Sequence, residues 1–232
     1  MSGDTNQLGS GLVKRSGKRL LRGHKVNIYF VIDTTISMDD KIKALLLTCV
    51  GFVDVPATYN LDAGFVLVSF GDLKVPHDKI VVEVPLTTEL EKIKTGLLSI
   101  NRNWGGGNWG ESSFEAIAKA LTVSGRSGAV NVMILITDEP AHQRTFTATQ
   151  VKNMLAQHQM LLYGLTPNIG YYREIIKARG GQWAEIDSSS SLDMLKGLFE
   201  QLARDVTETV RDVYHLTDGD VSEYLLLTSG DE

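Results

Sequence analysis

The sequence contains a single cysteine, Cys49, so no internal disulfide can form. It has no apolar run that approaches the ~18 residues a membrane-spanning helix needs. Its first residues lack the basic-then-apolar pattern of a cleaved secretory signal. We therefore expect a cytoplasmic protein without a membrane span, in a reducing compartment where Cys49 is a small core residue.

Each end of the chain lacks charges of one sign. Residues 5–32 contain no acid but six lysines and arginines, and no Lys or Arg follows Arg211. We interpret 1–24 as a basic flexible tail, 25–212 as the folded domain and 213–232 as an acidic tail. Nucleic-acid binding by the basic tail is not favoured, because no aromatic residues are interleaved with its charges. Residues 224–227 either pack back on the domain or form a docking segment for a partner.

Strand-like and helix-like patterns alternate along the chain. The 232 residues, 43% of them hydrophobic, suit one α/β domain. Apolar runs rich in β-branched and aromatic residues predict strands at 26–33, 63–70, 79–84, 129–138, 159–165 and 182–186. The connection before 79–84 is too short for a crossover helix, so this strand should be an antiparallel edge strand that Pro85 ends. The predicted fold class is α/β, a doubly wound, mainly parallel six-stranded sheet with one antiparallel edge strand and helices on both faces.

Acids and hydroxyls follow two of the buried strands. Asp33 ends the first strand, and Thr35 and Ser37 follow it at a spacing of two before a helix begins. Asp138 ends a later strand in the same way. Either acid alone would fit a helix cap or a turn. Two such acids at central strand ends instead favour a ligand site, because open α/β sheets bind ligands there. Carboxylates and hydroxyls are hard oxygen donors suited to Mg²⁺, Mn²⁺ or Ca²⁺.

With these motifs, residues 25–210 resemble the von Willebrand factor type A domain, also called the integrin I-domain fold. The metal-ion-dependent adhesion site of that family has the pattern Asp-x-Ser-x-Ser, then a threonine, then an aspartate at a later strand end. Asp33-Thr-Thr35-Ile-Ser37 matches the first element and Asp138 matches the last. The resemblance implies a bound Mg²⁺, with Mn²⁺ or Ca²⁺ as alternatives. It also implies direct contacts from Thr35 and Ser37 and charge neutralisation by Asp33 and Asp138.

The middle ligand departs from the family pattern. A Gly-Gly-Gly-x-x-x-Glu run places Glu111 where the threonine usually lies, and Ile36 stands where a glycine is common. Three ionised acids would overcompensate a divalent ion. Either Glu111 contacts the ion through water or contacts only its direct ligands, or it occupies the coordination position that a partner's carboxylate would take. We include Glu111 among the predicted metal-site residues.

Two tryptophans flank the glycine-rich run and predict a partner-binding rim. The expected rim residues are Trp104, Asn108, Trp109 and Glu139. Tryptophan is enriched among interface anchors, although packing of either indole over the glycines is an equal alternative. His142 follows Asp138 closely, but one histidine without a second histidine or a cysteine is weak evidence for zinc.

The resemblance implies a non-catalytic, metal-dependent protein-binding module of an intracellular multi-protein assembly, whose ion accepts an Asp or Glu side chain of a partner. Stand-alone intracellular members act beside chaperone-like ATPases, kinases or phosphatases, which are therefore the expected partners. The alternative is a metal-free scaffold that binds through its tails or helices. A Mg²⁺-dependent phosphohydrolase with Asp33 as nucleophile is disfavoured, because Thr35 stands where a second acid would be needed and no phosphate-binding glycine loop follows the first strand.

Overall fold

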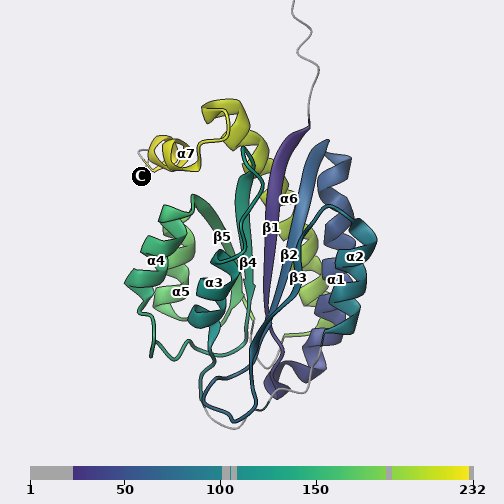
Figure 1. Cartoon of the computed structure of the whole chain (residues 1–232), viewed down its shortest axis with the longest axis vertical. Coiled ribbons are helices and arrows are strands. Elements are labelled where there is room, and N and C mark those ends of the chain that lie inside the picture. Colours follow the sequence, from purple (N-terminus) through teal and green to yellow (C-terminus); the bar gives the residue numbers. More distant parts are fainter. Residues whose placement is uncertain (1–22, 101–104, 106–108, 187–189, 230–232) are drawn as a thin grey trace, which may run out of the picture.

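One six-stranded sheet organises the molecule (Figure 1). The computed structural model describes residues 23–100, 105, 109–186 and 190–229. The strands are β1 His24–Asp33, β2 Leu61–Phe70, β3 Ile80–Thr87, β4 Val130–Ile136, β5 Met160–Thr166 and β6 Trp183–Glu185. The helices are η1 Ile36–Met38, α1 Asp39–Thr58, α2 Leu90–Ser99, α3 Ser113–Leu121, α4 Ala148–Gln157, α5 Gly170–Ala178, α6 Leu192–Thr217 and α7 Val221–Thr228. None of the helices in these ranges is long and apolar enough to cross a bilayer.

The strand order is β3-β2-β1-β4-β5-β6, and only the β2–β3 pair is antiparallel. The predicted fold class is therefore confirmed. One detail of the prediction was wrong, because β3 runs through Pro85 to Thr87. The pairing of β3 with β2 shifts register on both sides of Leu67, next to this proline. An edge strand pairs on one side only, so it tolerates a residue that cannot donate a backbone hydrogen bond.

Two apolar layers cover the faces of the sheet. Because side chains alternate along a strand, Phe30 of β1 faces the layer with α1, α2 and α6, whereas Val31 faces the layer with α3, α4 and α5 (Figure 1). The whole of β1 from Val26 to Asp33 is buried, as its continuous apolar run predicted. Cys49 is also fully buried in the first layer, which confirms it as a core residue.

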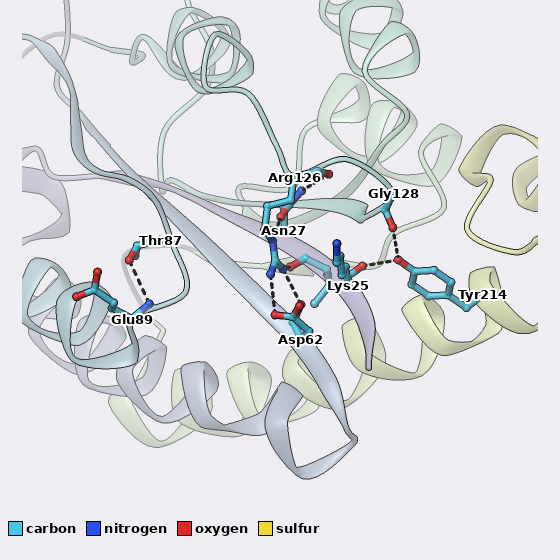
Figure 2. A network of polar contacts seen from close by, with 9 residues as sticks. Lys25, Asn27, Asp62, Thr87, Glu89, Arg126, Gly128 and Tyr214 are labelled. Atoms are coloured by element: carbon cyan, nitrogen blue, oxygen red, sulfur yellow. Dashed lines mark hydrogen bonds and ion pairs between the residues drawn. The ribbon is translucent and has the colours of Figure 1, made fainter. Parts of the chain in front are cut away.

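Arg126 clamps the amino ends of two central strands (Figure 2). Its Nη2 donates to the carbonyl oxygens of Val26 in β1 (2.7 Å) and of Asp62 in β2 (2.6 Å). Its Nη1 contacts the Asp62 carboxylate at 2.6 Å, and its Nε donates to Asn27 Oδ1 at 2.9 Å. Surface ion pairs contribute little on their own, but a guanidinium that also satisfies two strand carbonyls joins β1 to β2.

The last long helix extends beyond the expected domain boundary. The Tyr214 hydroxyl of α6 lies 2.6 Å from the Lys25 carbonyl oxygen and 2.9 Å from that of Gly128 (Figure 2), and its ring stacks on His24. A boundary between residues 212 and 213 would therefore cut through α6, which continues to Thr217.

Helix α7 follows α6 and has two different sides. Tyr224 and Leu225 pack, half-buried, against the core, whereas Leu226 and Leu227 are exposed. Part of segment 224–227 thus packs back on the domain, and the rest presents apolar surface. The predicted basic tail, 1–24, lies almost entirely outside the described residues.

We expect Gly181→Ala to destabilise the domain by about 3 kcal/mol or more. A Cβ at this position would clash with the carbonyl oxygen of Leu162, so the backbone of β5 would have to move. Gly197→Ala in α6 is the matched control, because its Cβ would meet nothing within 4 Å. That control should stabilise α6 by up to about 1 kcal/mol. Equilibrium unfolding in urea measures both, and equal effects would contradict the close approach at Gly181.

Candidate functional site

The acids predicted from the two strand ends meet at one edge of the sheet. Asp33 is the last residue of β1, and Asp138 lies two residues after β4. These strands are parallel neighbours, and the strand order changes direction between them. Their loops lie at the lower end of the sheet in Figure 1. This position is the switch point at which open α/β sheets form ligand sites.

Four of the five predicted site residues form one continuous chain of polar contacts. Thr35 Oγ1 donates to Asp33 Oδ1 at 2.7 Å and lies 3.0 Å from Ser37 Oγ. Ser37 Oγ in turn donates to Asp138 Oδ1 at 2.9 Å. Ser37 is exposed and Asp33 is fully buried, so this chain runs from the core to the surface.

The Asp33 carboxylate is held on both oxygens. Besides the Thr35 hydroxyl, Oδ1 accepts the Thr35 backbone N–H at 3.0 Å, and Oδ2 accepts the Thr137 hydroxyl at 2.7 Å. Thr34 ties the same loop to β2, because its hydroxyl donates to the Phe70 carbonyl oxygen at 3.1 Å. Thr137 was not among the predicted site residues. Its hydroxyl, directly before a strand-end acid, was the signal that could have identified it.

Glu111 is the fifth predicted residue, and a backbone bridge with the loop after β4 positions it. Its N–H donates to the Pro140 carbonyl oxygen at 2.8 Å, and its carbonyl oxygen accepts the His142 N–H at 3.1 Å, which pairs Glu111 with Ala141. The Glu111 side chain is only 2% exposed. Its Oε2 is buried and has no hydrogen-bond partner among the residues the structure describes. A carboxylate oxygen in that position is unusual, because buried polar atoms are normally paired.

Burial and mutual repulsion shift the pKa values of both buried acids upward. Burial raises the pKa of Asp33 to about 7, against the hydrogen bonds from Thr35 and Thr137, and the charge on Asp138 adds to the rise. Burial raises the pKa of Glu111 to about 9. The further causes of the Glu111 shift are the charges on Asp33, Asp72, Glu139 and Asp78, in that order. The site is therefore an acidic cluster in which each negative charge disfavours the others.

The loop after β2 adds an acid that the sequence analysis missed. Asp72 is fully buried, and its Oδ1 accepts the Lys74 N–H at 2.9 Å and lies 2.9 Å from His142 Nε2. The other ring nitrogen of His142 lies 2.7 Å from Lys74 Nζ. His142 thus links a buried acid to a lysine. Asp72 comes two residues after a buried strand, so the rule that identified Asp33 and Asp138 could have identified it.

The structure describes only part of the predicted rim. The Trp109 side chain is 79% exposed, two residues before Glu111, and Glu139 is half-buried. Trp104 and Asn108 lie outside the described residues. Gly110 has φ +96° between Trp109 and Glu111, and a Cβ there would lie 2.7 Å from His142 Nδ1. Only glycine fits this close approach without strain.

In the described part of the chain, no three His, Cys, Asp or Glu side chains form a group that could hold a metal ion. The hydroxyls of Thr35 and Ser37 nevertheless stand between two carboxylates, beside a third that has an unpaired oxygen. The edge of the sheet therefore gathers hard oxygen donors and excess negative charge, which is the chemistry that divalent cations bind.

Comparison with known proteins decides the family. Residues 27–179 match the sequence model described as "von Willebrand factor A domain". The chain belongs to this family. A search of curated proteins finds no match.

Solved structures share the von Willebrand factor A (vWA) fold. Proximal thread matrix protein 1 from the mussel byssus, solved with a zinc-occupied MIDAS motif, is similar with a TM-score of 0.62 and 17% identity over 80% of this chain and 46% of its own. BatB of Bacteroides thetaiotaomicron, a conserved hypothetical protein, gives a TM-score of 0.55 and 17% identity over 79% and 99% of the two chains. A von Willebrand factor type A protein from Catenulispora acidiphila gives 0.55 and 16% over 78% and 42%. This chain thus spans less than half of the mussel and Catenulispora chains, and at these identities the likeness shows the fold alone.

Proposed function

We propose that this vWA domain is a non-catalytic, divalent-metal-dependent protein-binding module, with its ion in a site of the metal-ion-dependent adhesion type. The observation that carries the proposal is the chain of polar contacts Asp33–Thr35–Ser37–Asp138 at the switch point of the sheet. Neutral hydroxyls between two carboxylates supply oxygen donors without cancelling all of a cation's charge.

The residues present fit a divalent cation. Thr35 and Ser37 would contact it directly, and Asp33 and Asp138 would neutralise its charge. Glu111 supports the fit independently, because its buried Oε2 has no described partner and neighbouring acids raise its pKa. A nearby cation would relieve that repulsion, so we assign Glu111 the role of a buried counter-charge. We propose Mg²⁺, with Mn²⁺ or Ca²⁺ as alternatives, and include Zn²⁺ because the mussel protein's site holds it.

The module would recognise an acidic side chain of a protein partner. A bound ion supplies a Lewis-acid position for an Asp or Glu oxygen, while the residues of this chain orient the partner around it. The exposed Trp109 supports a rim at Trp104, Asn108, Trp109 and Glu139, because a tryptophan in water favours burial by a partner.

We place the partners inside the cell, in an assembly that includes ATPase, kinase or phosphatase components. The lone buried Cys49 supports a reducing compartment. Catalysis is not part of the proposal, because Thr35 occupies the position where a phosphohydrolase of this kind needs its second acid.

Calorimetric titration of metal-stripped protein with Mg²⁺, Mn²⁺, Ca²⁺ and Zn²⁺ tests the ion. We expect saturable binding of at least one ion at one site per chain, because the contacts Asp33–Thr35–Ser37–Asp138 bring two carboxylates and two hydroxyls together at this edge. Each titration would be repeated on Ser37→Ala, whose exposed hydroxyl can be removed without opening a core cavity. Absence of binding would instead favour a metal-free scaffold that contacts partners through its helices or tails. Binding that is unchanged in Ser37→Ala would contradict the assignment of the ion to this site.

A further inference from the structure

Like Glu111, Arg179 has a buried polar atom without a hydrogen-bond partner among the described residues, and it lies at the opposite end of the sheet. This residue follows the end of α5, and its Nε donates to the carbonyl oxygen of Met160, the first residue of β5, at 2.9 Å. Its own carbonyl oxygen accepts the Leu162 N–H at 3.3 Å. Arg179 therefore sits at the amino ends of the parallel strands, whereas the proposed metal site sits at their carboxyl ends.

Arg179 is buried and forms no ion pair with an acid among the described residues. Arg179 is 7% exposed, and its Nη2 is buried and donates no hydrogen bond to any described residue. Burial lowers the pKa of Arg179, and no acid contributes an opposing shift. Arginine is rarely buried unless it is paired, because removing its charge from water costs several kcal/mol. The domain therefore carries an uncompensated cost at this position.

Arg179 lines a groove of about 850 Å³ between the end of α5 and helix α7. On the α7 side, the groove is lined by the apolar residues Tyr224, Leu225 and Leu226, the last of which is 76% exposed, together with Ser222, Thr228 and Ser229. Glu174 is the acid that lines the groove in the described residues, but it is exposed and lies 3.8 Å from Lys152. The groove thus combines a buried cation with an open apolar wall.

We propose that the α5–α7 groove binds an acidic peptide segment of a partner protein, with a carboxylate of the peptide paired to Arg179 and a neighbouring apolar side chain packed on Leu226. Charge complementarity selects an acid, because Arg179 lines the groove and has no acidic partner among the described residues. The apolar wall and the volume of the groove favour a peptide over a small inorganic anion. Figure 1 shows α7 at the end of the sheet opposite the β1 and β4 loops, so this site is separate from the proposed ion site.

Selection from a displayed library of random octapeptides, carried out in chelator, tests the proposal without any contribution from a divalent ion. We expect the recovered peptides to contain Asp or Glu next to a large apolar residue. For a recovered peptide, the affinity measured by fluorescence anisotropy should fall about tenfold or more in Arg179→Met and when the peptide's acid is changed to its amide. Leu226→Ser should also weaken binding. Arg204→Met is the matched control, because it removes the same charge from an exposed position on α6.

Several outcomes would overturn the proposal. They are recovery of no peptides, recovery of peptides without acids, and affinities that Arg179→Met and Arg204→Met reduce equally. Thermal unfolding shows whether Arg179→Met is folded, and we expect it to be at least as stable as the wild type, because an unpaired buried charge is removed. If that variant does not fold, Leu226→Ser and the amide form of the peptide still decide the question. Failure here would leave the ion titration untouched, since the two sites share no residue.

Discussion

Asp33→Asn should weaken divalent-metal binding by about 100-fold or more while the domain remains folded. The substitution keeps the shape of the side chain and its oxygen acceptor for the Thr35 N–H and hydroxyl, which now approach Oδ1 at 3.0 and 2.7 Å. It removes the charge that a cation would neutralise. Calorimetric titration gives the loss of affinity, and circular dichroism shows whether the fold is kept.

The same substitution should raise the stability of the metal-free domain above neutral pH. Asp33 is fully buried, and its pKa is raised to about 7, so ionisation of this carboxyl opposes folding. An amide in its place carries no such cost. Each kcal/mol gained would raise the melting temperature by about 2–4 °C in a domain of this size.

Asp54→Asn is the matched control for Asp33→Asn. Asp54 is an exposed acid on α1 that pairs with Lys94, away from the strand ends. Its replacement should change neither metal affinity nor stability measurably, because exposed ion pairs contribute little. If both variants bound metal like the wild type, the strand-end site would not be the metal site. If Asp33→Asn lowered the melting temperature in chelator, Asp33 would be a structural cap and not an acid held at a cost.

The sequence predicted the sheet because local patterns dictate it. β1 and β4 are continuous apolar runs. Asp33 ends β1 and Asp138 lies two residues after β4, so the proximity of these acids follows from the topology of a parallel sheet. The continuation of α6 beyond residue 212 could also have been predicted from the sequence. Val213 continues the buried stripe of Val206 and Val210, although the prediction placed the domain boundary just before it.

Other features depend on contacts that no local pattern encodes. The position of Glu111 beside Asp33 rests on its backbone bridge to Ala141, thirty residues along the chain. Its buried oxygen has no partner among the described residues, and its pKa is raised by burial and then by the charges on Asp33 and on Asp72 in a third loop. The unpaired guanidinium of Arg179 depends likewise on where α7 comes to lie. Features that depend on long-range pairing therefore could not be predicted from the sequence.

Glu111 gives the metal-free domain an expected dependence on pH. Its carboxyl has an ordinary pKa near 4.5, which burial and the neighbouring acids raise to about 9 in the folded state. Between these values the folded state holds a proton that the unfolded state releases. The contribution of Glu111 to the free energy of unfolding should therefore be highest below about pH 4.5 and fall as pH rises toward 9, by at most about 1.4 kcal/mol per pH unit.

Glu111→Gln should flatten this profile, because the amide has no proton to lose. Urea unfolding in chelator at pH 6 and pH 8 measures the effect, and the wild type should lose more stability between the two than the variant does. Saturating Mg²⁺ should reduce the loss in the wild type, because a cation that favours the ionised carboxylate offsets its burial and its repulsion by Asp33. Glu115→Gln is the control, since Glu115 lies on α3 just beyond the site. If the free energy of unfolding of Glu111→Gln depended on pH as that of the wild type does, Glu111 would not be the acid whose burial opposes folding. Its assignment as the counter-charge of the ion would then also be wrong.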